Sequence, residues 1–307
     1  MPKLSTDLVP GLHLKNPLIL SSGAVANARS LLHFLDLGAV TTKTVTPQPR
    51  IGYRGRRVVR LPTGLVNAIG LENPGPVKLA NELKTVLPKL LEVDTKVITS
   101  LAVTTGDEFR YVANYLSDVS HAFELNISCP HVEEYLRLSE DVSALRNLLR
   151  EVRDISAKPL LVKLPAITLK RYFLKLVDTV LEFCDCLVVA NTVPATYVDP
   201  STLALVLPSL DRCGGYSGPG IKPIVQRLVY LVCSEYPDVS VIATGGVMCG
   251  TDVLEYIALG ARAVGICSAV LLCGITIVSE ILQELVKELE NRGFDDVNEI
   301  RGIALRR

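Results

Sequence analysis

Short apolar runs rich in β-branched residues recur along the chain and alternate with longer segments of helical periodicity. Because these runs are apolar nearly throughout, we expect them to be strands buried on both faces, as in a parallel sheet covered by helices. The eight predicted strands are Pro17–Ser22, Ala39–Val45, Lys96–Val103, Ala122–Ser128, Pro159–Leu164, Cys186–Asn191, Ser240–Thr244 and Ala263–Ser268.

Each predicted strand is followed by a candidate helix, in which apolar residues recur at intervals of three and four. The clearest helices are Val77–Leu91, Val142–Ile155, Leu169–Phe183, Ile221–Ser234, Thr251–Leu259 and Thr276–Arg292. Eight such units predict a (β/α)8 barrel that forms a single domain over residues 1–307. A doubly wound open sheet is the alternative, but no GxGxxG follows the first strand. The polar stretch Thr46–Arg60 is interpreted as a long surface loop of the same domain.

Polar residues follow six of the predicted strands, and in a barrel the chemistry lies at the carboxyl ends of the strands. Any one of these groups could be a satisfied polar group of the core, but six together favour a site. They are Ser21-Ser22-Gly23, Lys43-Thr44, Asn126-Ile127-Ser128-Cys129, Lys163, Asn191-Thr192 and Thr244-Gly245-Gly246.

The stretch from Phe123 to His131 brings an amide, a hydroxyl, a thiol and an imidazole to the end of one strand. Pro130 ends the strand because it has no N–H to donate, so Cys129 lies at the lip of the strand. A lone cysteine beside a turn is more often structural. Its polar neighbours favour a chemical role here.

Two groups of glycines point to a phosphate. Gly245-Gly246 precedes the helix at Thr251, and Gly214-Gly215-Tyr216-Ser217-Gly218 precedes the helix at Ile221. Backbone N–H groups at such helix starts hold a phosphate without a cation. Lys163 would be costly to bury unless it faces an anionic ligand, and a reduced flavin is such a ligand.

Composition narrows the class of protein. Lysine plus arginine equals aspartate plus glutamate at 32 each, so the net charge does not call for nucleic acid or an anionic membrane. The eight cysteines form no CxxC pair, which predicts reduced thiols in a cytoplasmic protein with no disulfide and no metal site. No apolar segment is long enough to span a membrane, so we expect no membrane partner.

Several motifs carry a resemblance to a known family. In order along the chain they include Asn16-Pro17, Lys43-Thr44-Val45-Thr46, Asn67 to Gly75 (NAIGLENPG), Asn126-Ile127-Ser128-Cys129-Pro130, Val162-Lys163-Leu164 and Thr244-Gly245-Gly246. The chain resembles the dihydroorotate dehydrogenases, flavoproteins of pyrimidine biosynthesis with an FMN-bearing (β/α)8 barrel. The NAIGLxNPG form is most similar to class 1B, which passes electrons to NAD through a separate iron–sulfur flavoprotein subunit.

The resemblance implies oxidation of (S)-dihydroorotate to orotate with one FMN per chain. Cys129 would take the proton from C5 while C6 gives hydride to flavin N5. The residues expected to bind substrate are Lys43, Asn67, Ile69, Gly70, Leu71, Asn126, His131, Asn191 and Thr192. The residues expected to bind FMN are Ser22, Gly23, Lys43, Thr44, Ser100, Asn126, Lys163, Gly218, Gly245, Gly246, Cys267 and Ser268. Lys163 would neutralise the reduced flavin at N1 and O2.

The same resemblance implies partners. We expect a homodimer that associates with a subunit carrying FAD and a 2Fe-2S cluster. A serine in place of Cys129 marks the membrane-associated class 2 enzymes, whose amino-terminal membrane extension is absent here, so quinone is disfavoured as the direct acceptor.

Three departures from the family pattern bear on these expectations. His131 stands where the orotate enzymes have asparagine and is similar to the dihydropyrimidine dehydrogenases that act on uracil and thymine. The stretch Val132 to Leu138 lacks the glycine-rich lid sequence of class 1B, which leaves a non-catalytic barrel that serves as a partner subunit or flavin carrier as a further alternative. Gly265-Ile266-Cys267-Ser268 replaces the usual valine–glycine–threonine, so Cys267 stands for a glycine.

Overall fold

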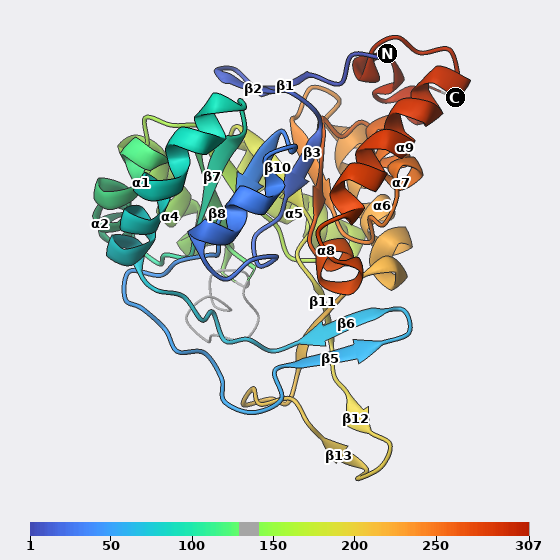
Figure 1. The fold of residues 1–307 in the computed structure, drawn as a ribbon. Helices are drawn as coiled ribbons and strands as arrows, with labels where there is room; N and C mark the ends of the chain where they lie inside the picture. Colours follow the sequence, from blue (N-terminus) through green and yellow to red (C-terminus); the bar gives the residue numbers. More distant parts are fainter. Residues whose placement is uncertain (129–140, 307) are drawn as a thin grey trace.

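In the computed structural model, residues 1–128 and 141–306 are described. Eight parallel strands of these segments close a barrel (Figure 1). Around the barrel they run in the order β10, β15, β16, β3, β4, β7, β8 and β9. Their bounds are β3 Leu18–Leu20, β4 Ala39–Thr41, β7 Lys96–Leu101, β8 Ala122–Asn126, β9 Leu160–Lys163, β10 Cys186–Val189, β15 Val241–Thr244 and β16 Ala263–Ile266. The predicted (β/α)8 barrel is confirmed, and each strand lies within its predicted range.

Helices cover the outside of the barrel (Figure 1). Their bounds are α1 Pro76–Glu92, α2 Gly106–Leu116, α4 Val142–Ile155, α5 Lys170–Leu181, α6 Lys222–Glu235, α7 Gly250–Ala258, α8 Ser268–Cys273 and α9 Ile277–Asn291. Short 3-10 helices are η1 Ala28–Phe34, η2 Ser117–Val119, η3 Pro219–Ile221, η4 Val297–Ile300 and η5 Ile303–Leu305. No described helix is long and apolar enough to cross a bilayer.

Two apolar layers hold the barrel together because alternate strand residues face opposite sides. Outward residues such as Phe123 and Leu125 pack against the helices. Inward residues such as Ile98 and Leu161 fill the amino-terminal half of the barrel, where the hairpin of β1 (Thr6–Val9) and β2 (Leu12–Leu14) closes the end. The polar inward residues lie at the opposite end, which is therefore the end available for a site.

A second sheet lies beyond the carboxyl ends of the barrel strands (Figure 1). Its strands run in the order β11 (Val193–Ala195), β14 (Gly214–Ser217), β6 (Gly64–Asn67) and β5 (Val58–Leu61). A further hairpin of β12 (Val198–Asp199) and β13 (Ala204–Leu205) extends from it. The sheet joins segments far apart in sequence, since Asn67 of β6 pairs with Gly215 of β14.

This sheet corrects two interpretations of the sequence. The predicted loop Thr46–Arg60 is wrong at its carboxyl end, because Val58 to Arg60 belong to β5. This strand pairs with β6, to which a tight turn connects it. Gly214 to Ser217 do not form a helix-start turn either. They form strand β14, which pairs with β11 on one side and β6 on the other. The backbone groups of this stretch therefore form the hydrogen bonds of the sheet. Only Gly218 remains before η3 and α6.

Candidate active site

A cavity of about 320 Å³ opens at the carboxyl ends of the barrel strands. Most residues that the sequence singled out line this cavity, although they come from segments spread over the chain. They are Ser22, Gly23, Lys43, Thr44, Asn67, Ile69, Gly70, Leu71, Asn126, Lys163, Asn191, Thr192, Gly245, Gly246, Cys267 and Ser268. The structure therefore brings the predicted substrate and cofactor residues into one place.

Two of the predicted residues that the structure describes are not part of this lining. Ser100 is fully buried behind the cavity wall, and Gly218 lies next to the lining residue Ser217. Cys129 and His131 lie outside the described residues.

Other lining residues were not predicted as site residues. Val58 and Leu65 come from β5 and β6, and Leu271 comes from α8. The further members are Ser21, Ala190, Ser217, Ile221, Thr244, Val247, Gly265 and Ile266. The sequence analysis named Ser21 and Thr244 as polar residues at strand ends but assigned them no role. The apolar lining residues cannot be told from core residues by sequence alone.

A chain of hydroxyl groups connects the cavity to a buried carboxylate. Ser22 Oγ lies 2.9 Å from Thr44 Oγ1, which lies 2.9 Å from Ser100 Oγ. Ser100 Oγ donates to Glu124 Oε1 at 2.8 Å, and Glu124 is 3% exposed. Because the Ser100 hydroxyl has one hydrogen and donates it in the bond to Glu124 Oε1, Ser100 Oγ must accept from Thr44. Thr44 in turn accepts from Ser22, and Glu124 thus fixes the direction of the whole chain.

Amide and hydroxyl groups orient one another on the next strands. Asn191 Nδ2 donates to Ser128 Oγ at 2.6 Å, and Ser128 Oγ donates to Asn126 Oδ1 at 2.8 Å. Asn191 Oδ1 accepts from the Thr192 N–H at 2.8 Å. These bonds hold two amide side chains in fixed rotamers at the cavity wall, which suits recognition of a planar ligand with several polar edges.

The second sheet, made of β11, β14, β6 and β5 and called the mouth sheet from here on, supplies the wall of the cavity that faces the barrel. Asn67 Nδ2 donates to the Gly215 carbonyl at 3.1 Å. A Cβ on Gly215 would lie 1.9 Å from Thr192 Oγ1, so glycine is required for the close approach of Thr192 to β14. Leu71 has φ +54°, a left-handed conformation that is costly for a leucine. Such strain concentrates at functional sites.

Lys163 is a buried cation that meets no counter-charge among residues 1–128 and 141–306. It is 5% exposed and lies beside Asn126 in the pairing of β9 with β8. Among the described residues, its ammonium group has neither a hydrogen-bond acceptor nor an ion-pair partner. Burial raises the pKa of the neighbouring Cys267 thiol, and the positive charges of Lys163 and Lys43 oppose that rise. An uncompensated buried ammonium is costly, so the cavity suits an anionic ligand.

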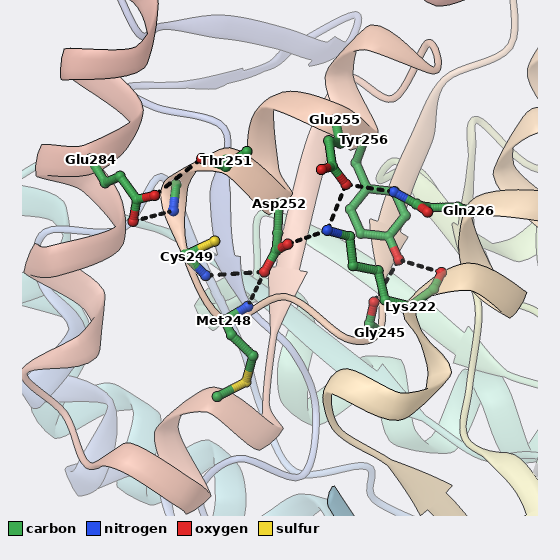
Figure 2. A network of polar contacts seen from close by, with 11 residues as sticks. Lys222, Gln226, Gly245, Met248, Cys249, Thr251, Asp252, Glu255, Tyr256 and Glu284 are labelled. Atoms are coloured by element: carbon green, nitrogen blue, oxygen red, sulfur yellow. Dashed lines mark hydrogen bonds and ion pairs between the residues drawn. The ribbon is translucent and has the colours of Figure 1, made fainter. Parts of the chain in front are cut away.

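The loop after β15 presents backbone N–H groups to the same cavity. Gly245 and Gly246 have φ +141° and +76°, and both line the cavity with Val247. Within the described chain, no acceptor meets the N–H groups of Gly246 or Val247. Figure 2 shows the contacts behind this loop, where the Tyr256 hydroxyl reaches the Gly245 carbonyl. Unsatisfied N–H groups at a glycine pair are the donors that bind a phosphate.

Comparison with known proteins decides the family. The model of the dihydroorotate dehydrogenase family matches residues 4–289. The chain belongs to the dihydroorotate dehydrogenase family. A Pyrococcus furiosus protein named dihydroorotate dehydrogenase B (NAD(+)), catalytic subunit, is 38% identical over 298 residues, which cover 96% of each chain. A Staphylococcus carnosus protein of the same name is 35% identical over 309 residues and 98% of each chain.

A solved structure agrees in fold. The crystal structure of DHODH from Eimeria tenella in complex with ferulenol superposes with a TM-score of 0.85 at 22% identity, over 100% of this chain and 90% of that one. The resemblance to the class 1B members of the dihydroorotate dehydrogenase family is confirmed by the names of the relatives.

Two observations test whether this site fits FMN, the flavin of the dihydroorotate dehydrogenase family. The Lys163 ammonium, which has no partner in the described part of the chain, suits a ring system that gains negative charge when it is reduced. The N–H groups of Gly246 and Val247, which no acceptor of the described residues meets, suit a terminal phosphate. Both lie in one cavity, and the residues present therefore fit the group.

Proposed function

We propose that the protein oxidises (S)-dihydroorotate to orotate with FMN, as a step of pyrimidine biosynthesis. The observation that carries the proposal is Lys163, a buried ammonium group that lacks a described partner and faces the cavity. The names of the relatives give the substrate class.

FMN would lie across the carboxyl ends of the barrel strands. Lys163 would face the flavin ring, and Gly245 and Gly246 would hold the phosphate, with Cys267 and Ser268 beside them. Ser22, Gly23, Thr44 and Asn126 would contact the ring from the barrel wall that also carries Lys163, and Ser100 would act from behind Thr44. When bound, FMN supplies an acceptor for the hydride from C6.

Dihydroorotate would lie between this wall and the mouth sheet. Its carboxylate and ring amides require cationic and amide partners, which Lys43, Asn67 and Asn191 offer at the cavity. The backbone from Ile69 to Leu71 closes the same side, and Thr192 is fixed there by the bond between its N–H and Asn191 Oδ1. The two asparagines can read both donor and acceptor edges of the pyrimidine.

Cys129 would remove the proton from C5 of dihydroorotate. It follows Ser128, whose hydroxyl is bonded to Asn126 and Asn191 in the cavity wall. The assignment rests on the family resemblance, because Cys129 and its neighbour His131 lie outside the described residues.

The electrons would leave through a partner subunit. The relatives named B are NAD(+)-linked catalytic subunits. We infer a second polypeptide with FAD and a 2Fe-2S cluster, a homodimer of the present chain and a cytoplasmic location.

Anaerobic titration of the purified flavoprotein tests the function. Dihydroorotate should bleach the flavin absorbance, and dihydrouracil should do so far more slowly. Faster bleaching by dihydrouracil would favour the dihydropyrimidine dehydrogenase alternative that His131 motivates. Absence of bleaching by both would overturn the proposal.

A further inference from the structure

Tyr256 lies directly behind the glycine loop of the cavity. Its side chain is fully buried, and its hydroxyl donates to the Gly245 carbonyl at 2.6 Å (Figure 2). The Lys222 carbonyl lies farther away, at 3.4 Å. Burial, with Asp252 and Glu255 nearby, raises the pKa of Tyr256 well above its usual range. The hydroxyl therefore keeps the proton that it donates.

This bond sets the direction of a donor in the cavity. The Gly245 carbonyl and the Gly246 N–H belong to one trans peptide, so they point in opposite directions. Because the carbonyl is held toward Tyr256, the Gly246 N–H points away from Tyr256. Gly246 lines the cavity, and no described acceptor meets its N–H. The tyrosine hydroxyl thus orients a free donor of the site that it does not itself touch.

Lys222, the first residue of α6, packs closely against Gly246 of the same loop. A Cβ on Gly246 would lie 2.5 to 2.7 Å from atoms of Lys222, so the loop rests against the first turn of this helix. The Lys222 ammonium pairs with Asp252 and, at 2.6 Å, with Glu255 of α7. Burial lowers its pKa, but these bonds outweigh burial and raise it overall.

Asp252 holds the far end of the loop. One carboxylate oxygen pairs with Lys222, and the other accepts from the N–H groups of Met248 at 2.7 Å and Cys249 at 3.2 Å (Figure 2). Residues 245–249 are therefore anchored at both ends to α7, through Tyr256 and Asp252. The anchors leave only the middle of the loop free to contact a ligand.

We propose that Tyr256 is a positioning residue of this site, which holds the Gly245–Gly246 peptide so that its N–H faces the phosphate of FMN. The inference rests on the proposed function, because it takes the phosphate-bearing ligand to be FMN. It assigns Lys222 and Asp252 as the clamp that fixes the same loop. None of the three residues needs to contact the flavin ring.

The test compares FMN with riboflavin, which has the same ring system without the phosphate. Full-length protein is stripped of flavin, and the Kd of each flavin is measured by fluorescence quenching. Tyr256→Phe removes only the hydroxyl. We expect the Kd for FMN to rise about tenfold, the scale of one lost buried hydrogen bond, and the Kd for riboflavin to change less than about twofold.

Tyr236→Phe is the matched control. Tyr236 follows the other end of α6 and bonds Asp178, so the variant loses a tyrosine hydroxyl bond away from the cavity. It should bind both flavins like the wild type. Asp252→Ala is a second variant. It removes the hydrogen bonds to the N–H groups of Met248 and Cys249 and the ion pair with Lys222, and it should also raise the Kd for FMN more than the Kd for riboflavin.

Each outcome decides between the two proposals. Equal losses for FMN and riboflavin in Tyr256→Phe would show a general packing role and overturn the inference. Unchanged binding of both flavins would overturn it as well. In either case wild-type binding of FMN would leave the proposed function intact. A wild type that binds neither flavin would overturn the proposed function and the inference together.

Discussion

Lys163 on β9 lies directly opposite Asn126 on β8 in the parallel pairing of these two strands. Both side chains point into the barrel because Glu124, two residues before Asn126, also lies inside it. The pairing places a cation next to an amide whose oxygen is already occupied by Ser128. The barrel register therefore leaves the ammonium group to a ligand.

Replacement of this lysine should separate its functional role from its effect on stability. Lys163→Met removes the cation and keeps most of the side-chain volume. We expect dihydroorotate to bleach the flavin about a hundredfold more slowly, the scale for loss of one preorganised electrostatic contact. The flavin-free variant should be more stable than the flavin-free wild type by about 1 kcal/mol or more, because a buried charge is gone.

Rapid-reaction absorbance and urea unfolding measure these two effects. Lys84→Met, at an exposed position of α1, is the control and should change neither. A Lys163→Met variant that is reduced at the wild-type rate would contradict the assigned role.

The hydroxyl chain behind the cavity should contribute to stability through Glu124. In the described part of the chain, Ser100 is the one hydrogen-bond donor to this buried carboxylate. Ser100→Ala leaves Glu124 without that donor, and we expect the free energy of unfolding to fall by about 1–3 kcal/mol. Urea denaturation measures the loss.

A double variant checks the cause. Glu124→Met combined with Ser100→Ala removes both partners and should recover part of the stability, because no buried carboxylate is left without its donor. Ser279→Ala, on the exposed face of α9, controls for the loss of a hydroxyl. If the double variant is less stable than Ser100→Ala alone, the buried carboxylate is not the source of the loss.

Buried thiols should make the fold sensitive to alkaline pH. Burial raises the pKa of Cys186, inside the barrel, to about 12 and that of Cys233, on α6, to about 12. The unfolded chain titrates its thiols near pH 8.5, so above that pH the unfolded state binds fewer protons than the folded state. Stability is therefore fully present below about pH 8.5 and falls as the pH rises toward the folded pKa.

Each of the two thiols should contribute about 1.4 kcal/mol of loss per pH unit in that window. Denaturation at pH 8, 9 and 10 measures the slope. Cys186→Ala should be less stable than the wild type at pH 8, because it leaves a cavity, but should show a shallower decline. An unchanged slope would contradict the linkage.

The sequence predicted the barrel well because its strands are apolar on both faces. Cys186–Val189, for example, is buried throughout, and a short β-branched run of this kind is typical of a strand buried on both faces. The helix Val142–Ile155 was predicted to the residue from its apolar periodicity, and in the structure Asp141 caps its first turn. The helix Gly106–Leu116 was not singled out, although Thr105 and Glu108 carry the pattern of a capping box.

The residues of the site were predicted from motifs, but their contacts could not be. Asn67 and Gly215 are 148 positions apart, and only the mouth sheet brings them together. Ser100 joins Thr44 to Glu124 across three barrel strands, a relation with no local signature. Tyr256 was not singled out, because the partner of its hydroxyl is a carbonyl of another loop, that of Gly245. Such partners are fixed by strand register and helix packing.

Removal of the proposed base, Cys129, should slow flavin reduction strongly and leave the binding of dihydroorotate largely unchanged. Cys129→Ala is expected to lower the rate of flavin reduction by about two to four powers of ten, the usual scale for loss of a general base. The Kd for dihydroorotate should be largely kept, because the amide groups of Asn67, Asn126 and Asn191 remain. Anaerobic stopped-flow absorbance gives both quantities from the dependence of the rate on substrate concentration.

Cys273→Ala removes an exposed thiol at the end of α8 and should react like the wild type. A Cys129→Ala variant that is reduced as fast as this control would require another base.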